Sequence, residues 1–196
     1  TNCLNYNKTL NSHMMKNDEW GAVAYLSKSK YGKNAEVDIN DDSSYYTGGG
    51  SGNAYVNNVG QSTTGTVHGV YDMSGGAYEY VAAYVNNGNS SLSNGESLVN
   101  GDAKTKNVYS KGSSDDRDSN YSANSGKYGD AVYETSVNGN SSNSSWYGDD
   151  SYFPDTNSPF FLRGAFYGAG TSGGVFYFED GNSFNTYSFR PVLVVL

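Results

Sequence analysis

The chain has 196 residues, a length that fits one domain with a sizeable hydrophobic core. Its 12 Lys and Arg residues stand against 20 Asp and Glu residues, which gives a net charge of −8 with no basic run to offset it. Because such a surface repels a phosphate backbone, we predict that the protein does not bind nucleic acid. No stretch reaches the roughly 18 apolar residues that a membrane helix requires, so no direct membrane insertion is expected.

The polar character of the chain comes from Asn, Ser, Gly and Tyr rather than from charge. There are 25 Gly and 19 Tyr residues, while charged residues make up only 16 %. Tyr offers broad amphipathic contact area and Ser, Gly and Asn offer adaptable hydrogen bonds, a combination that antibody paratopes use for recognition. A soluble, loop-rich protein without a ligand would have a similar composition, so both interpretations remain open on composition alone.

The first regular element predicted is a helix that begins at Asn17 or Asp18 and ends near Gly32, with acidic residues in its first turn. Apolar and small residues recur on one side of it at helical spacing: Trp20, Val23, Ala24 and Ser27. A polar loop is expected over 34–60. A Ser-Gly-Gly turn then leads into a strand over 78–85, where Tyr and Ala alternate with Glu and Val.

The second half of the chain is irregular before it becomes ordered again. Residues 86–158 are rich in Asn, Ser, Gly and Asp, with short elements expected only around 108–109 and 131–135. Three strands are predicted near the end, at 160–164, 174–178 and 188–196, with a turn at 179–182. Pro191 is expected at a strand start or edge. This pattern predicts one α+β domain over residues 1–196.

Three stretches carry motifs in a characteristic order. Residues 19–24 are Glu-Trp-Gly-Ala-Val-Ala, residues 69–80 are Gly-Val-Tyr-Asp-Met-Ser-Gly-Gly-Ala-Tyr-Glu-Tyr, and the end holds Leu-Arg-Gly at 162–164 and Ser-Phe-Arg at 188–190. Together they resemble the formylglycine-generating-enzyme (sulfatase-modifying factor) branch of the C-type lectin fold. The resemblance implies a C-type-lectin-like fold, in which one main helix and long irregular loops surround a small antiparallel sheet.

The family's oxygen chemistry needs residues that this chain lacks. Its enzymes hold copper with a cysteine pair near the closing motifs, and related iron-dependent sulfoxide synthases use three histidines. No cysteine lies between Arg163 and Arg190, and Cys3 is the only one in the chain. Only His13 and His68 are present, each expected at a surface or in a turn, and no histidine follows a serine-nucleophile motif. We therefore predict that the protein is not an enzyme.

A structural calcium ion is the one cofactor that the resemblance suggests. The family holds it partly with an Asn-Val-Trp-Glu stretch, in which Gly76 here replaces the Asn while Glu79 remains. Glu79 is thus the candidate metal ligand. Asp116, Asp118 and Asn120 begin like an EF-hand loop, but the glycine and the distal Glu of that loop are missing, so a solvated acidic loop is expected there.

A candidate binding face lies between the two closing motifs. The predicted ligand-binding residues are Phe166, Tyr167, Tyr177, Glu179, Asp180, Asn182, Phe184, Asn185 and Tyr187. Their arrangement resembles that of the variable proteins of diversity-generating retroelements, which use the same fold and the same closing pattern with randomised codons between. The alternative is that Phe176, Phe178 and Phe184 are core residues and the others belong to an ordinary loop; for Phe176 and Phe178 a core position is expected.

These features predict a non-catalytic, extracellular or surface-displayed module for ligand binding or adhesion, on a bacterial or phage surface. Its ligand would be a protein or a glycan on a cell or host surface. A protein is favoured because the Glu-Pro-Asn and Gln-Pro-Asp trios of calcium-dependent lectins are missing. Two alternatives remain open: a structural subunit of a pilus-like or phage-tail assembly, and an unrecognised enzyme of the same superfamily.

Overall fold

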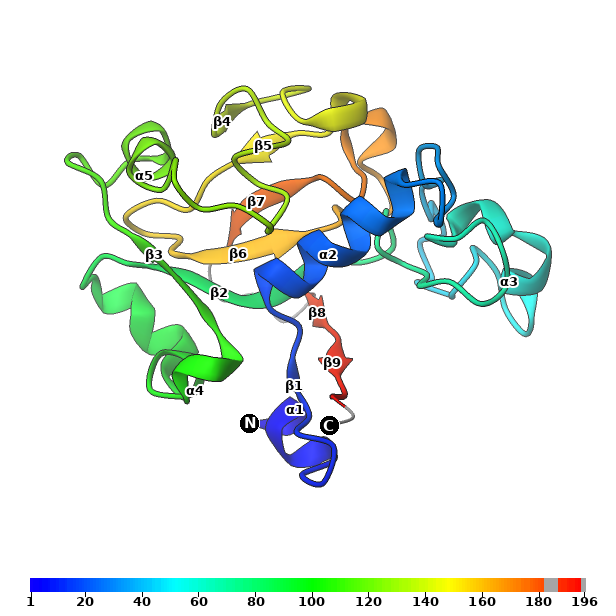
Figure 1. Ribbon diagram of the computed structural model, residues 1–196, viewed down its shortest axis with the longest axis horizontal. Helices are drawn as coiled ribbons and strands as arrows, with labels where there is room; N and C mark the ends of the chain where they lie inside the picture. Colours follow the sequence, from blue (N-terminus) through cyan, green and yellow to red (C-terminus); the bar gives the residue numbers. More distant parts are fainter. Residues whose placement is uncertain (182–186, 195–196) are drawn as a thin grey trace.

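The computed structural model describes residues 1–181 and 187–194 and shows an α+β protein with few helices around a curled sheet (Figure 1). Its longest described helix, α2 (Asn17–Lys28), has 12 residues, in agreement with the prediction of one main helix. The other α-helices are α1 (Asn2–Tyr6), α3 (Ala54–Asn57), α4 (Glu96–Val99) and α5 (Arg117–Ala123). The 3₁₀ turns are η1 (Val59–Gln61), η2 (Ser90–Gly95), η3 (Ala103–Thr105), η4 (Trp146–Gly148) and η5 (Gly170–Ser172).

The main sheet has the strand order β3-β2-β6-β7-β5-β4, and β8 pairs with β2. Its strands are β2 (Glu79–Asn86), β3 (Asn107–Ser110), β4 (Asn140–Ser141), β5 (Ser151–Tyr152), β6 (Phe160–Arg163), β7 (Phe178–Gly181) and β8 (Ser188–Phe189). The predicted antiparallel sheet is in fact mixed, because β2 runs parallel to both β3 and β8, and β5 runs parallel to β7. Long connections between these strands make the parallel pairings sterically feasible.

The two ends of the chain meet in a separate two-stranded ribbon. There β1 (His13–Met14) pairs antiparallel with β9 (Pro191–Val192), so the N-terminal and C-terminal segments lie side by side (Figure 1). Pro191 opens β9, as predicted for a residue that cannot donate a ladder hydrogen bond.

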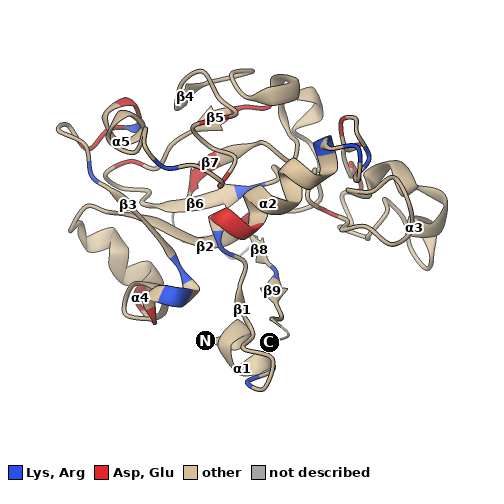
Figure 2. Cartoon of the chain, viewed as in Figure 1, with Lys and Arg blue, Asp and Glu red and all other residues tan. Residues whose placement is uncertain are grey.

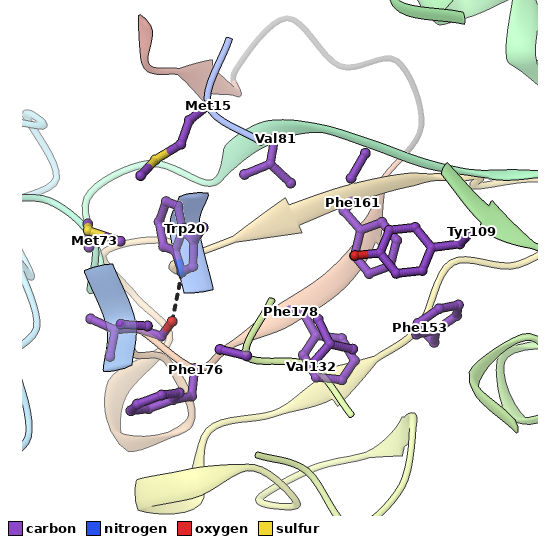
Figure 3. Packing of buried hydrophobic residues seen from close by; sticks show 14 of the residues in the cluster. Met15, Trp20, Met73, Val81, Tyr109, Val132, Phe153, Phe161, Phe176 and Phe178 are labelled. Atoms are coloured by element: carbon purple, nitrogen blue, oxygen red, sulfur yellow. Dashed lines mark hydrogen bonds between the residues drawn. The ribbon is translucent and has the colours of Figure 1, made fainter. Parts of the chain in front are cut away.

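Helix α2 begins where the sequence predicts it, but it ends at Lys28, before the predicted end near Gly32. The Glu19 carboxylate accepts a hydrogen bond from the Lys16 backbone N–H (2.9 Å), and Lys28 lies in the last turn, where it complements the helix dipole. Trp20 and Ala24 on its inner face are fully buried. Figure 3 shows Trp20 near Met15 and Met73 at one end of the core, with Phe176 below it.

The strands have two distinct faces because successive side chains alternate. Val81, Ala83 and Val85 of β2 belong to the main core, which α2 covers. Tyr80 and Tyr84 point to the opposite face, where Tyr84 packs with other apolar residues in a smaller cluster. We call this second surface the outer face of the sheet.

Strand β7 begins later than the sequence suggests. The predicted strand at 174–178 is wrong over 174–177, which form a turn, and Glu179 lies in β7 rather than in the predicted turn at 179–182. The Asp149 carboxylate accepts a hydrogen bond from the Phe176 backbone N–H (2.9 Å), which holds the turn without any strand partner. Phe176 and Phe178 are both 0 % exposed, so their predicted core positions are confirmed although only Phe178 lies in a strand.

Four smaller expectations also differ from the structure. The loop at 34–60 contains α3 and part of η1, and the short element expected around 131–135 is a turn. The last predicted strand, at 188–196, is split into β8 and β9 at Arg190, whose side chain turns inward to bind Glu79. His13 is buried and lies 2.8 Å from the Glu19 carboxylate, whereas the predicted surface position holds for His68.

Candidate functional site

Seven aromatic rings form a continuous cluster at one end of the sheet. Tyr78 lies at its centre, with ring centroids 5.3 Å from Phe166, 5.3 Å from Tyr187 and 6.0 Å from Tyr177. The cluster continues outward through three further contacts: Phe166–Tyr167 at 5.5 Å, Tyr167–Tyr45 at 5.7 Å and Tyr187–Tyr80 at 5.5 Å. These separations are typical of packed aromatic pairs. We call the seven residues the ring cluster.

The fold assembles the ring cluster from segments that are distant in sequence. Tyr78 precedes β2, Phe166 follows β6 and Tyr177 precedes β7, so the ends of neighbouring strands meet there. The chain reverses after β6 through Gly164 and Ala165, whose φ angles are 81° and 63°. This turn is tied to the loop before β2, because Tyr167 donates its backbone N–H to the Gly76 carbonyl (2.7 Å).

The ring cluster is partly exposed and therefore accessible to a ligand. Tyr45 is 52 % exposed, and most of the other rings are partly buried, whereas Tyr177 is only 4 % exposed. Tyr177 thus supports the other rings from beneath instead of presenting a contact surface. A rigid aromatic surface of this kind offers large contact area at little cost in conformational entropy.

One carboxylate lies among the rings. Tyr177 donates its hydroxyl hydrogen to Glu179. Burial, followed by the negative charge of Glu179, raises the pKa of Tyr78 to about 12, and the same two causes raise the pKa of Tyr177. The tyrosines around Glu179 therefore remain neutral hydroxyl donors over the physiological pH range.

Asp180 does not belong to this group, although the sequence places it next to Glu179. The two side chains of β7 point to opposite faces, and Asp180 forms an ion pair with Arg117 of α5. Burial raises the pKa of Asp180 to about 6, and the Arg117 charge partly opposes that shift. The structure thus brings together five of the predicted residues, namely Phe166, Tyr167, Tyr177, Glu179 and Tyr187. Asn182, Phe184 and Asn185 lie outside the described residues.

Three members of the ring cluster were missed by the sequence analysis. Tyr78 and Tyr80 had a detectable signal, because their alternation with Glu79 predicts that they share a strand face. Tyr45 had no such signal in the sequence, because it lies far from the closing motifs along the chain and the path of its loop cannot be predicted from local residues.

Glu79 forms an ion pair with Arg190. Its Oε2 accepts a hydrogen bond from Arg190 Nε (2.6 Å), and its Oε1 accepts one from Arg190 Nη2. Arg190 also donates to the backbone carbonyl of Asp72 (3.0 Å). The carboxylate is thus already bonded to a guanidinium, and the role of Glu79 as a calcium ligand stays a prediction.

Residues 1–181 and 187–194 contain no cluster of three or more His, Cys, Asp or Glu side chains with metal-binding geometry. The predicted acidic loop that begins at Asp116 is instead the start of α5. Asp116 caps this helix by accepting from the Ser119 backbone N–H (2.8 Å), and Asn120 is buried with its amide bonded to the Pro154 carbonyl (2.9 Å). In the same described part of the chain, no helix combines the length and apolar character that spanning a bilayer requires.

A pocket of about 270 Å³ lies elsewhere, near α1 and α4. Cys3, Leu98 and Phe189 are among its lining residues, and none of the residues that line it is charged. It shares no residue with the ring cluster. Burial raises the pKa of the Cys3 thiol, which disfavours the nucleophilic thiolate. We therefore regard the ring cluster with Glu179 as the candidate site.

Asp149 supports this site through the turn at 174–177, and its raised pKa predicts that stability depends on pH. It is 1 % exposed, and burial raises its pKa to about 7 from 3.8. The folded state then binds more protons than the unfolded state between these pH values, so the free energy of unfolding falls as the pH rises from about 4 to 7. The titration of Asp149 alone can lower the free energy of unfolding by at most about 4 kcal/mol over this range, at 1.36 kcal/mol per pKa unit.

Asp149→Asn is expected to flatten this pH dependence, because the amide oxygen can still accept from Phe176 while no proton is taken up. Urea unfolding of both proteins at pH 4.5, 6 and 7.5 measures the difference. Equal slopes in the two proteins would show that Asp149 titrates at its ordinary pKa.

The chain was compared with protein-family models, with curated proteins and with solved structures, and none of these comparisons gives a match.

Proposed function

We propose that this protein is a non-catalytic binding or adhesion module that acts outside the cell or on its surface, and that the ring cluster is its ligand-contacting face. The observation that carries the proposal is the meeting of seven rings from separate segments around Tyr78. Most of these rings are partly exposed, although burying them in the core would release more water. Partly exposed, well-packed Tyr residues are typical anchors of protein interfaces.

We further propose that the fold is C-type-lectin-like and similar to the formylglycine-generating-enzyme branch. The contacts among the motif residues support this. Glu79 of the central motif pairs with Arg190 of the last motif. Arg163 of the third motif lies 5.7 Å from the ring of Trp20, which belongs to the first motif. The motifs thus form one framework, on whose edge the ring cluster is displayed.

Protein and glycan ligands are distinguished by direct measurement. The wild-type protein is applied to a peptide array and to a glycan array, and the affinity for the bound members is then measured. Tyr167→Ala combined with Tyr187→Ala is expected to weaken binding at least thirtyfold, because each ring would contribute about 1 kcal/mol or more. The free energy of unfolding should change by less than about 2 kcal/mol, since neither ring is fully buried.

A matched control replaces two exposed tyrosines outside the ring cluster. Tyr31 and Tyr128 are 74 % and 71 % exposed, and Tyr31→Ala combined with Tyr128→Ala should leave binding unchanged. Retained binding in the Tyr167/Tyr187 variant would show that the ring cluster is not the contact face. Stable self-assembly of the wild type in sedimentation, lost in the same variant, would instead support a structural subunit.

A further inference from the structure

Glu179 is a carboxylate that has no ion-pair partner among the residues that the structure describes. Among the described residues the ion pairs involve Glu79, Asp180 and other carboxylates, but not Glu179. The remaining residues, 182–186 and 195–196, contain no Lys, Arg or His. The adjacent Asp180, in contrast, is paired with Arg117. The Glu179 carboxylate accepts a hydrogen bond from Tyr177 but has no cation beside it in the described part of the chain. It is therefore suited to accept hydrogen bonds from a positively charged group of a ligand.

Three rings of the ring cluster also carry no protein cation over their faces, within the part of the chain that the structure describes. Lys28 lies 4.0 Å from the centroid of Tyr147, and Arg117 lies 4.9 Å from that of Tyr152. Other Lys and Arg side chains lie over Tyr31, Tyr84, Tyr109 and Trp20. None lies over Tyr78, Phe166 or Tyr167. Among the described residues, Lys and Arg side chains therefore cover many aromatic rings but not these three rings of the ring cluster.

The chemistry that fits such a site is a planar cation. A guanidinium group stacks on an aromatic face and at the same time donates two hydrogen bonds to a carboxylate, which an ammonium ion cannot do in the same way. A neutral sugar could stack on the rings and donate hydroxyl hydrogen bonds to Glu179, but it would bring no positive charge to offset the desolvation of this carboxylate. The net charge of −8 also attracts basic partners; Figure 2 shows the Asp and Glu residues of the chain in red.

We propose that the ring cluster and Glu179 form a recognition site for an arginine side chain of a protein partner. The proposal rests on the proposed function and adds the chemical class of the ligand. In this arrangement the guanidinium stacks on the exposed rings and binds the Glu179 carboxylate, while Tyr177 holds that carboxylate in place from beneath.

The test uses small probes of known charge. The peptide Ac-Gly-Arg-Gly-amide is titrated into protein labelled with ¹³C in its tyrosine rings, in parallel with its neutral citrulline analogue, tetramethylammonium and methyl β-glucoside. We expect the arginine peptide to shift the signals of Tyr78 and Tyr167 with a Kd at least about tenfold lower than that of the citrulline peptide, the usual gain from a hydrogen bond to a charged group. Tighter binding of tetramethylammonium or of the glucoside would overturn the arginine assignment.

Glu179→Gln is expected to remove the difference between the arginine and citrulline peptides. Glu96→Gln is the matched control, because Glu96 is an exposed carboxylate on α4 and its loss changes the net charge equally. If Glu96→Gln has the same effect as Glu179→Gln, only the overall charge matters and the proposed site is wrong. If the array ligands bind at the ring cluster but do not depend on Glu179, the arginine inference fails while the proposed function stands.

Discussion

Replacing Trp20 by alanine is expected to lower the free energy of unfolding by about 3–5 kcal/mol, the usual cost of deleting a large aromatic side chain from a core. Trp20 is 0 % exposed, and its indole N–H donates to the Val175 carbonyl (2.8 Å), the bond drawn in Figure 3. Its ring also packs against Gly164, where an added Cβ would lie 3.2 Å from Trp20 Cη2. The side chain therefore joins α2 to the turns before β7 and after β6.

Trp20→Phe separates the loss of buried apolar surface from the loss of the hydrogen bond to Val175. Phenylalanine keeps most of the apolar surface but cannot donate to Val175, so a smaller loss of about 1–3 kcal/mol is expected. Urea unfolding followed by circular dichroism measures both variants. A change below about 1 kcal/mol for Trp20→Ala would mean that α2 is not the element that closes the core.

Replacing Arg190 by methionine is expected to cost about 3–5 kcal/mol at pH 7, because it leaves the buried Glu79 carboxylate without its counter-charge. Glu79 is 6 % exposed. Burial already raises its pKa, and Arg190 provides the main opposing effect, so the pKa should rise further in the variant. The folded variant then takes up a proton at a higher pH than the unfolded chain does. The cost should consequently diminish as the pH falls towards the unfolded-state pKa of about 4.3.

A second substitution tests whether the unpaired charge causes this loss. Adding Glu79→Gln to Arg190→Met should recover part of the stability at pH 7, since no buried charge remains. Circular dichroism melts of the single and double variants at pH 5 and pH 7 provide the comparison. If the double variant is less stable than Arg190→Met at pH 7, the loss comes from the backbone contacts of Arg190 with Tyr71 and Asp72 instead.

The local sequence pattern was sufficient for the elements with strong periodicity. Trp20 and Ala24 predicted the buried face of α2, and the alternation around Glu79 predicted β2. It was insufficient for the turn at 174–177, where Val175, Phe176 and Tyr177 look like a strand but are held by Asp149. Asp149 is distant in sequence from this turn, so the residues of the turn themselves do not reveal that a side chain takes the place of a strand partner.

The candidate site could be predicted only in part for the same reason. Phe166, Tyr167 and Tyr187 were identified by their position between two motifs, but Tyr45 reaches them from a loop whose path depends on tertiary contacts. The sequence places Asp180 in the same candidate face as Glu179 because both lie between the two closing motifs. Once Glu179 lies in a strand, the two-residue period places these carboxylates on opposite faces.

The central claim is that the ring cluster is the surface that contacts the ligand. It is tested most directly by NMR with ¹³C-labelled tyrosine rings, using whichever peptide or glycan the wild-type protein binds on the arrays. The account predicts that the ligand shifts the ring signals of Tyr45, Tyr78, Tyr167 and Tyr187 and leaves those of Tyr31 and Tyr128 unchanged. Shifts confined to Tyr31 or Tyr128, or a ligand that binds without moving any signal of the ring cluster, would contradict it.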